Sequence, residues 1–142
     1  MRLLACLLAL SFTLAAPNAF SRDTKHLLSI DEALASNTFQ ERLDPSIKLY
    51  FGDQRSGGGK SLGVFTTNKK TNAFNKSDED ACRWVFLSAL LSLQERARTE
   101  GATKVANITS YYKKNTYKSN TQYECHAGAI MAGVALQGEM LK

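Results

Sequence analysis

Hydrophobic residues recur at helical spacing in one long segment of this chain, between residues 78 and 100. The apolar positions lie three or four residues apart and form a broad arc: Cys82, Val85, Phe86, Ala89 and Leu93, widened by Trp84, Leu87 and Leu91. Ser77 suits the cap of the first turn, three acidic residues suit the positive end of the helix dipole, and Gly101 suits the end. The pattern predicts a helix over 78–100 that packs on a sheet, with Trp84 in the core and 94–100 solvated.

Alternating or continuous apolar residues predict four strands around this helix: 46–52, about 62–67, 104–112 and about 123–136. The last segment has apolar or small residues on both faces, which is typical of a central strand covered on both sides. We expect it to form a hairpin with 104–112 across the polar connection KKNTYKSNTQ. The predicted fold class is α+β, in the order β-β-α-β-β with one long helix on the sheet.

A short helical segment is predicted before the first of these strands. Ser29 to Glu32 has the form of a capping box, and the apolar residues that follow favour a short or broken helix, which Asp44-Pro45 ends. Residues 20–45 are therefore expected to form an N-terminal helical segment, and 46–142 a single α+β domain. His26 lies in a stretch that we expect to be mobile.

The first residues have the layout of a secretory signal peptide. Arg2 is followed by an apolar run to about Ala16, which is too short for an ordinary transmembrane helix, and small residues place a cleavage point after Ala19. Cys6 does not follow the apolar run, which argues against a lipid anchor. We expect residues 1–19 to be removed and the remainder to be a soluble periplasmic protein without a transmembrane anchor.

Removal of the leader leaves two of the three cysteines, Cys82 and Cys125, in an oxidising compartment. One intramolecular disulfide is the simplest interpretation, and closing a loop of this length contributes about 4 kcal/mol. A redox-active pair and a pair of metal ligands are the alternatives, although neither cysteine belongs to a C-x-x-C motif.

The stretch RSGGGKS, residues 55–61, resembles the end of a phosphate-binding loop. The first glycine of that motif would fall on Gln54, and the residues after Lys60 favour a strand where the motif requires a helix. We interpret the stretch as a glycine-rich hairpin loop between two strands, so ATP is not an expected ligand.

Catalytic residues are not evident in the sequence. Cys125 and His126 are adjacent on a predicted strand, so their side chains point to opposite faces and cannot hydrogen-bond to each other. The sequence also lacks a group of His, Cys or carboxylate residues at the spacing of metal ligands. We expect no enzymatic activity, no cofactor and no metal. A thiol- or metal-dependent protein that uses Cys82, Cys125 and His126 is the alternative.

Basic and aromatic side chains alternate near the end of the third predicted strand. Such surfaces contact anionic groups through cationic and stacking interactions. The chain is mildly basic, with 18 Lys and Arg against 13 Asp and Glu, and an exported protein is not expected to meet nucleic acid. An envelope protein or an anionic cell-wall component is the expected partner. The expected contact surface contains Lys69, Lys70, Tyr111, Tyr112, Lys113, Lys114, Tyr117 and Lys118.

The runs KLYFG, SLGVFTTNKKTNAFNKSDEDACRWVFLSALLSLQERARTEGA, VANITSYYKKN and YECHAGAIMAGVAL resemble a family of small exported proteobacterial proteins. Members often carry the label "excinuclease ATPase subunit". Because the phosphate-binding loop is incomplete and the leader directs the chain away from DNA, we interpret that label as a misannotation.

More distantly, GATKVANITS and the cysteine-bearing segment ending in GVAL are similar to the globular domain of the Rcs envelope stress-sensor lipoprotein. The resemblance implies a disulfide-stabilised α+β domain that signals envelope damage through protein contacts, with Cys125 matching a strand cysteine. This chain has one cysteine pair where that domain has two, and no lipobox. The resemblance extends to the fold, and the expected function is a non-enzymatic binding or envelope stress-response module.

Overall fold

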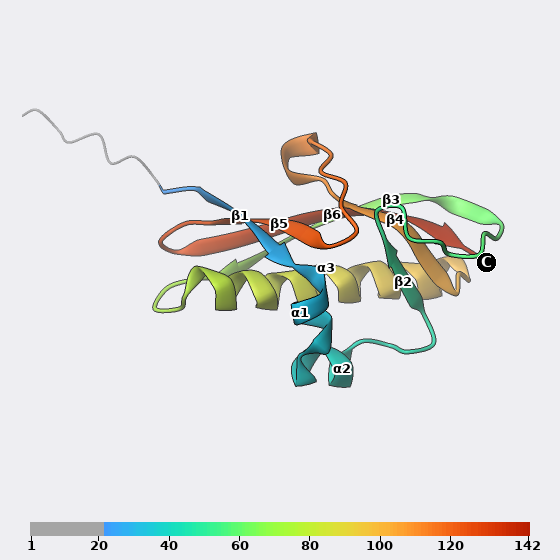
Figure 1. Cartoon of the computed structure of the whole chain (residues 1–142), viewed down its shortest axis with the longest axis horizontal. Coiled ribbons are helices and arrows are strands. Elements are labelled where there is room, and N and C mark those ends of the chain that lie inside the picture. The colour runs from blue at the N-terminus through green and yellow to red at the C-terminus, as the bar shows by residue number, and fades with distance from the viewer. Residues whose placement is uncertain (1–21) are drawn as a thin grey trace, which may run out of the picture.

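The structure is a computed structural model that describes residues 22–142, so the predicted leader and its cleavage site lie outside it. Its helices are α1 (Ile30–Ala35), α2 (Asn37–Arg42), α3 (Asp78–Glu100) and the short 3-10 turn η1 (Tyr112–Lys114). Its strands are β1 (Thr24–Ser29), β2 (Lys48–Phe51), β3 (Ser61–Asn72), β4 (Lys104–Ser110), β5 (Gln122–Ala127) and β6 (Met131–Leu141). One long helix packs against a curled sheet (Figure 1), which confirms the α+β class.

Strand β6 organises the sheet. Strand β3 pairs with one of its edges, while β5 and β4 share the other edge, β5 beside its first residues and β4 beside its second half. Strand β1 lies outside β5, and β2 lies outside β4. All pairs are antiparallel except β2 with β4, which is parallel. The central position predicted for the segment ending at Leu136 is confirmed for β6, but α3 covers only one of its faces, and the other face is open at Gly133.

The strand order differs from the predicted β-β-α-β-β in two places. An additional strand, β1, precedes the predicted ones, so His26 lies in a paired strand rather than in a mobile stretch. The predicted strand 123–136 is two strands, β5 and β6, joined by a tight turn in which the Gly128 N–H donates to the Met131 carbonyl at 2.8 Å. The hairpin predicted across the connection KKNTYKSNTQ is not formed, because β4 pairs with β6, mostly beyond Leu136, and not with β5.

The glycine-rich loop does not close a hairpin, because β2 pairs with β4 while β3 pairs with β6. It instead carries the chain from one part of the sheet to another. The Lys104 ammonium fixes it by donating to the carbonyls of Ser56 and Gly58 at 2.8 and 2.9 Å. Strand β3 follows Lys60 almost at once, so the strand predicted there is confirmed.

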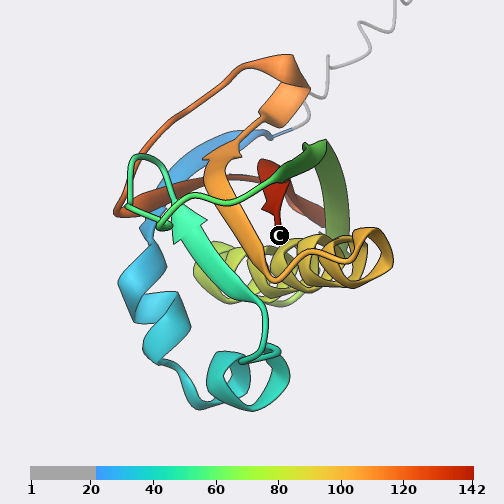
Figure 2. The ribbon, with the colours of Figure 1, turned by 90° about the vertical axis from the view of Figure 1, so that its right-hand side faces the viewer.

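Helix α3 begins and ends where the sequence predicts. The Ser77 hydroxyl accepts from the Asp80 N–H at 3.1 Å, and Gly101 ends the helix with φ +77°. The buried face of α3 centres on Phe86, whose ring stacks on Tyr123 of β5 at 3.8 Å between centroids. The sheet curls over this face of the helix (Figure 2). Burial of such large side chains is the main source of stability in the domain.

A disulfide joins Cys82 of α3 to Cys125 of β5, and both residues are fully buried. The expected pairing is therefore present, and it is typical of an oxidising compartment. In the part of the chain that the structure describes, no helix is both long enough and apolar enough to cross a membrane.

Two side chains of α3 are placed differently from the prediction. Trp84 is 45% exposed rather than in the core, and the Arg42 guanidinium lies 5.4 Å from its ring. Gln94, predicted to be solvated, is 1% exposed. The broken helix predicted before Asp44 is confirmed as α1 and α2, on either side of Ser36. The segment that follows it crosses α3 at Gln94, and this contact buries the Gln94 side chain.

Candidate functional site

The sheet face opposite α3 carries the connection between β4 and β5, which stands away from the sheet at the top of Figure 1. We call residues 111–118 the Tyr/Lys loop. Its start is bonded to β6, because the Tyr111 N–H donates to the Ala135 carbonyl at 2.8 Å. Its later part returns to β4, where Ser110 and Tyr117 exchange backbone hydrogen bonds at 3.0 and 2.9 Å. The loop therefore has a defined shape.

The tip of the Tyr/Lys loop has an unusual backbone. Lys113 and Lys114 have φ of +51° and +63°, in the left-handed region that side-chain-bearing residues rarely adopt. The turn is closed by a hydrogen bond from the Asn115 N–H to the Tyr112 carbonyl at 3.0 Å. Both lysines are exposed, and no ion pair within residues 22–142 involves either of them. Such strain is often found where a loop serves a function.

Below this tip, the Tyr112 ring stacks on the imidazole of His126 at 3.6 Å between centroids, with the two planes 9° apart. The Lys113 ammonium lies 5.5 Å from the centroid of the same tyrosine ring. Burial raises the pKa of the Tyr112 hydroxyl, and the carboxylates of Asp23 and Glu124 add to this effect. Tyr112 thus connects the exposed lysines to the floor of the sheet.

His126 lies between two carboxylates. Its Nδ1 is 3.1 Å from Asp23 and its Nε2 is 2.7 Å from Glu124, so both ring nitrogens are occupied. A general base needs a free ring nitrogen that can reach a substrate proton. The geometry therefore fits a structural role, in which the imidazole holds the start of β1 and the Tyr/Lys loop on β5.

The thiol–imidazole alternative is not assembled in the structure. Cys125 faces α3 and is bonded to Cys82, whereas His126 faces the opposite side of the sheet. In the described part of the chain, no cluster of three or more His, Cys, Asp or Glu side chains is arranged to hold a metal ion.

Lys69 and Lys70, predicted to lie on one surface, point to opposite faces of the sheet. Lys69 is paired with Val134, which belongs to the core under α3, and Lys70 is paired with Gly133 on the open face. Successive strand residues alternate between faces, and β3 continues to Asn72, beyond the predicted end near Thr67. Of these two lysines, only Lys70 therefore lies on the same face of the sheet as the Tyr/Lys loop.

Two other members of the predicted contact surface are held by neighbouring residues. Lys118 forms an ion pair with Asp53. The Tyr117 hydroxyl donates to Gln122 at 3.1 Å, and the Lys25 ammonium lies 5.9 Å from the Tyr117 ring. The groups that remain open to a partner are Tyr111, Tyr112, Lys113, Lys114 and Lys70.

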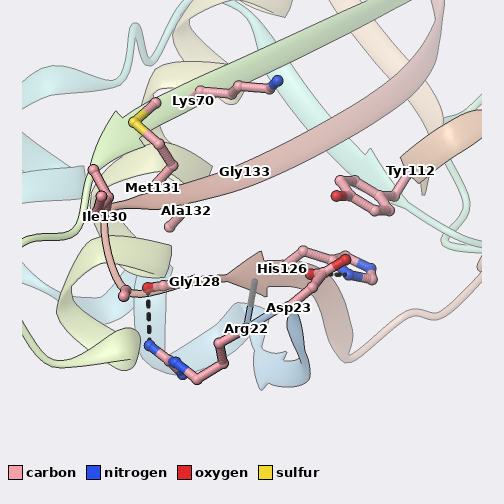
Figure 3. Close-up of a pocket in the computed structure, with 11 residues that line it drawn as sticks. Arg22, Asp23, Lys70, Tyr112, His126, Gly128, Ile130, Met131, Ala132 and Gly133 are labelled. Carbon is pink, nitrogen blue, oxygen red and sulfur yellow. Dashed lines mark hydrogen bonds and ion pairs between the residues drawn. The ribbon is translucent and has the colours of Figure 1, made fainter. Parts of the chain in front are cut away.

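A concavity of about 510 Å³ opens beside Tyr112 on the same face (Figure 3). Lys70 lies on one side of it, Tyr112 and His126 at one end, and the β5–β6 turn at the other. The turn contributes Ile130, which is 62% exposed. No sequence pattern indicated this concavity, because its walls come from β3, β5, β6 and the loop, which are distant in the sequence.

A second group of charges, not singled out in the sequence, fixes the start of the described chain. The Arg22 guanidinium donates to both oxygens of Asp78 at 2.7 and 2.9 Å and to the Gly128 carbonyl at 2.8 Å. His26 Nε2 lies 2.8 Å from the same carboxylate. Asp78 was explained by its place at the start of α3, and the structure adds that it ties β1 to that helix.

This arrangement predicts a pH-dependent loss of stability in Asp78→Asn. Hydrogen bonds from Arg22 and His26 hold the pKa of Asp78 well below its ordinary value. A carboxyl group whose pKa is lower in the folded state adds stability above its unfolded pKa of about 4, and loses it as the pH falls. We expect the variant to melt roughly 3 °C below wild type at pH 7, and the difference to shrink between about pH 4 and pH 2.

Thermal scans by circular dichroism across this pH range provide the measurement. Asp80→Asn is the matched control, because it removes the same charge from the same helical turn without touching Arg22 or His26. A constant difference between Asp78→Asn and wild type at all pH values would contradict the assignment.

Comparisons of the chain with protein-family models, with curated proteins and with solved structures found no match.

Proposed function

We propose that this chain is a non-enzymatic binding module of the bacterial periplasm, which contacts an acidic surface of an envelope protein through the Tyr/Lys loop. One observation carries the proposal: a strained turn holds Lys113 and Lys114 exposed at its tip, above a tyrosine stacked on the sheet. Exposed ammonium groups beside aromatic rings suit carboxylates on a partner. The disulfide supports an oxidising location.

The proposed role in envelope stress rests on the resemblance to the Rcs sensor domain and to the small exported family. The resemblance supplies the compartment and the mode of action, which is contact with other proteins. The Tyr/Lys loop supplies a surface for that contact. The concavity and loop lie on the sheet face opposite α3, so a partner can reach them without disturbing the core.

The proposal predicts that Lys113→Glu/Lys114→Glu weakens capture of the partner at least tenfold. The change reverses two charges at the contact, whereas both side chains are exposed and make little contribution to stability, so the melting temperature should move by about 2 °C or less. The measurement is photo-crosslinking from the Tyr/Lys loop in envelope extract, followed by identification and titration of the captured protein at two salt concentrations.

Lys48→Glu/Lys69→Glu is the control, because it makes the same charge change at exposed residues away from the loop. Capture should then remain close to that of wild type. Equal weakening in both double variants would show that net charge, and not the Tyr/Lys loop, drives binding. Recovery of cell-wall polymer without a discrete protein would overturn the proposed class of partner.

A further inference from the structure

The concavity exists because one side chain is missing from a row that crosses the open face of the sheet. The strand register places Lys25, His126, Gly133 and Lys70 side by side on β1, β5, β6 and β3. Three of these residues have long side chains, and Gly133 has none. The gap at Gly133 forms the floor between the stacked His126–Tyr112 pair and Lys70 (Figure 3).

Neither backbone geometry nor crowding requires glycine at position 133. Its φ is not in the left-handed region, and an added Cβ would meet the Lys69 carbonyl oxygen at 3.6 Å and the Tyr112 ring at 3.9 Å, which are ordinary contact distances. Glycine within a central strand costs about 0.5–1 kcal/mol of stability relative to alanine. In a strand, such a glycine often marks the close approach of a ligand or another chain.

The lining of the concavity is apolar at one end and carries a single unpaired cation. Ile130 and Met131 are 62% and 46% exposed, a large uncovered area for adjacent apolar side chains. Arg22 is bonded to Asp78 and Gly128. Lys70 has neither a hydrogen bond nor an ion pair from its side chain to any residue among 22–142. The charge available to a ligand is therefore one ammonium group.

We propose that this concavity is a binding site for a small amphiphilic carboxylate, with the carboxylate at Lys70 and the apolar body over Gly133 against Ile130 and Met131. Its volume of about 510 Å³ lies within the range of about 300–1,000 Å³ that is usual for small-molecule sites. The site goes beyond the proposed protein contact, because it needs neither Lys113 nor Lys114. Asp23 on the opposite wall disfavours a dianion, which restricts the ligand to one negative charge.

Decanoate is a suitable probe, with decanol as its uncharged counterpart. Wild type should bind decanoate at concentrations below micelle formation, with the largest NMR amide shifts at Gly133, Met131 and Lys70. Decanol should bind at least fivefold more weakly. The absence of saturable shifts with decanoate would overturn the proposal, and so would equal affinity for the two probes.

Gly133→Val tests the shape of the site, and Lys70→Ala tests its charge. The Cβ of a valine would lie at ordinary contact distances, and its methyl groups should fill the floor, so we expect a melting temperature within about 4 °C of wild type and at least tenfold weaker binding of decanoate. Lys70→Ala should weaken decanoate about fivefold and leave decanol unchanged, while Lys69→Ala, on the other face, should leave both unchanged. Undiminished decanoate binding in Gly133→Val would overturn the site.

These outcomes are separate from those of the proposed function. Lys113→Glu/Lys114→Glu should retain decanoate binding, because its changes lie at the tip of the Tyr/Lys loop and outside the lining of the concavity. Loss of protein capture with decanoate binding intact would uphold both proposals. Decanoate binding together with unaltered capture in that variant would uphold the small-molecule site alone.

Discussion

The double variant Cys82→Ala/Cys125→Ala is expected to unfold about 15 °C below wild type. The disulfide links residues 43 positions apart, and removing a constraint over a loop of that size costs about 4 kcal/mol on the chain-entropy account. For a domain of this length, each kcal/mol moves the melting temperature by about 3–5 °C. The chain without residues 1–19, followed by circular dichroism during heating, provides the measurement.

Reduction of the wild type is the matching control. A reducing agent should bring wild type to the melting temperature of the double variant and should leave the variant unaffected. Because both cysteines are fully buried, reduction is expected only after partial unfolding. A difference of less than about 4 °C between oxidised wild type and the variant would show that packing, and not the crosslink, holds α3 to β5.

Gln94→Leu is expected to lower the free energy of unfolding by about 2–4 kcal/mol. The Gln94 amide accepts from the Asp44 N–H at 2.9 Å and donates to the carbonyls of Asp44 and Ile47 at 2.9 and 3.0 Å. Leucine has a similar volume but can make none of these bonds, so buried backbone groups lose their partners. Urea unfolding followed by circular dichroism measures the change.

Gln137→Leu is the matched substitution for this experiment. Gln137 lies on the open face of β6 and makes one exposed hydrogen bond, 3.3 Å from its Nε2 to the Thr66 hydroxyl. Its replacement should change stability by about 0.5 kcal/mol or less. Similar losses in the two variants would contradict the role assigned to Gln94, since a general cost of the glutamine-to-leucine change would then explain both.

Local signals in the sequence were sufficient for α3. The Ser77 cap, the Gly101 stop and the spacing of apolar residues act within the helix itself, and the structure places its limits at 78 and 100. The capping box at Ser29 was equally local, and the Ser29 hydroxyl accepts from the Glu32 N–H at 3.2 Å. These features depend on neighbours in the sequence, so a pattern can reveal them.

The same local signals did not reveal which distant segments pair with each other. The sequence of β1, TKHLLS, has little alternation of apolar and polar residues, and this segment forms a strand because it pairs with β5. The turn at 128–130 lies inside a run of small apolar residues, which reads as one continuous strand. Gln94 became buried because the segment at Asp44 crosses α3, fifty residues away in the sequence.

The contact surface shows the same limit at the level of single residues. Residues 111–118 of the predicted contact surface lie in the connection between β4 and β5, but the sequence did not indicate which of their side chains have partners in the fold. Lys118 forms an exposed ion pair with Asp53, which lies in a loop far away in the sequence. Lys69 and Lys70 face opposite sides because β3 extends to Asn72. The residues after Thr67 are polar, so the sequence pattern did not indicate that the strand continues.

The narrow attachment of β5 to β6 has a mechanical consequence. Only two residue pairs, His126 with Gly133 and Ala127 with Ala132, join these strands, whereas β1 and β5 are paired along six residues. Tension applied at Arg22 would pass through β1 into β5, and those two pairs alone would resist little force. The covalent link from Cys125 to Cys82 transfers the load to α3. Tension from this end can therefore strip β1 from β5 while the disulfide keeps β5 on α3, and the β1–β5 pair can leave the sheet as a unit only after the disulfide is reduced.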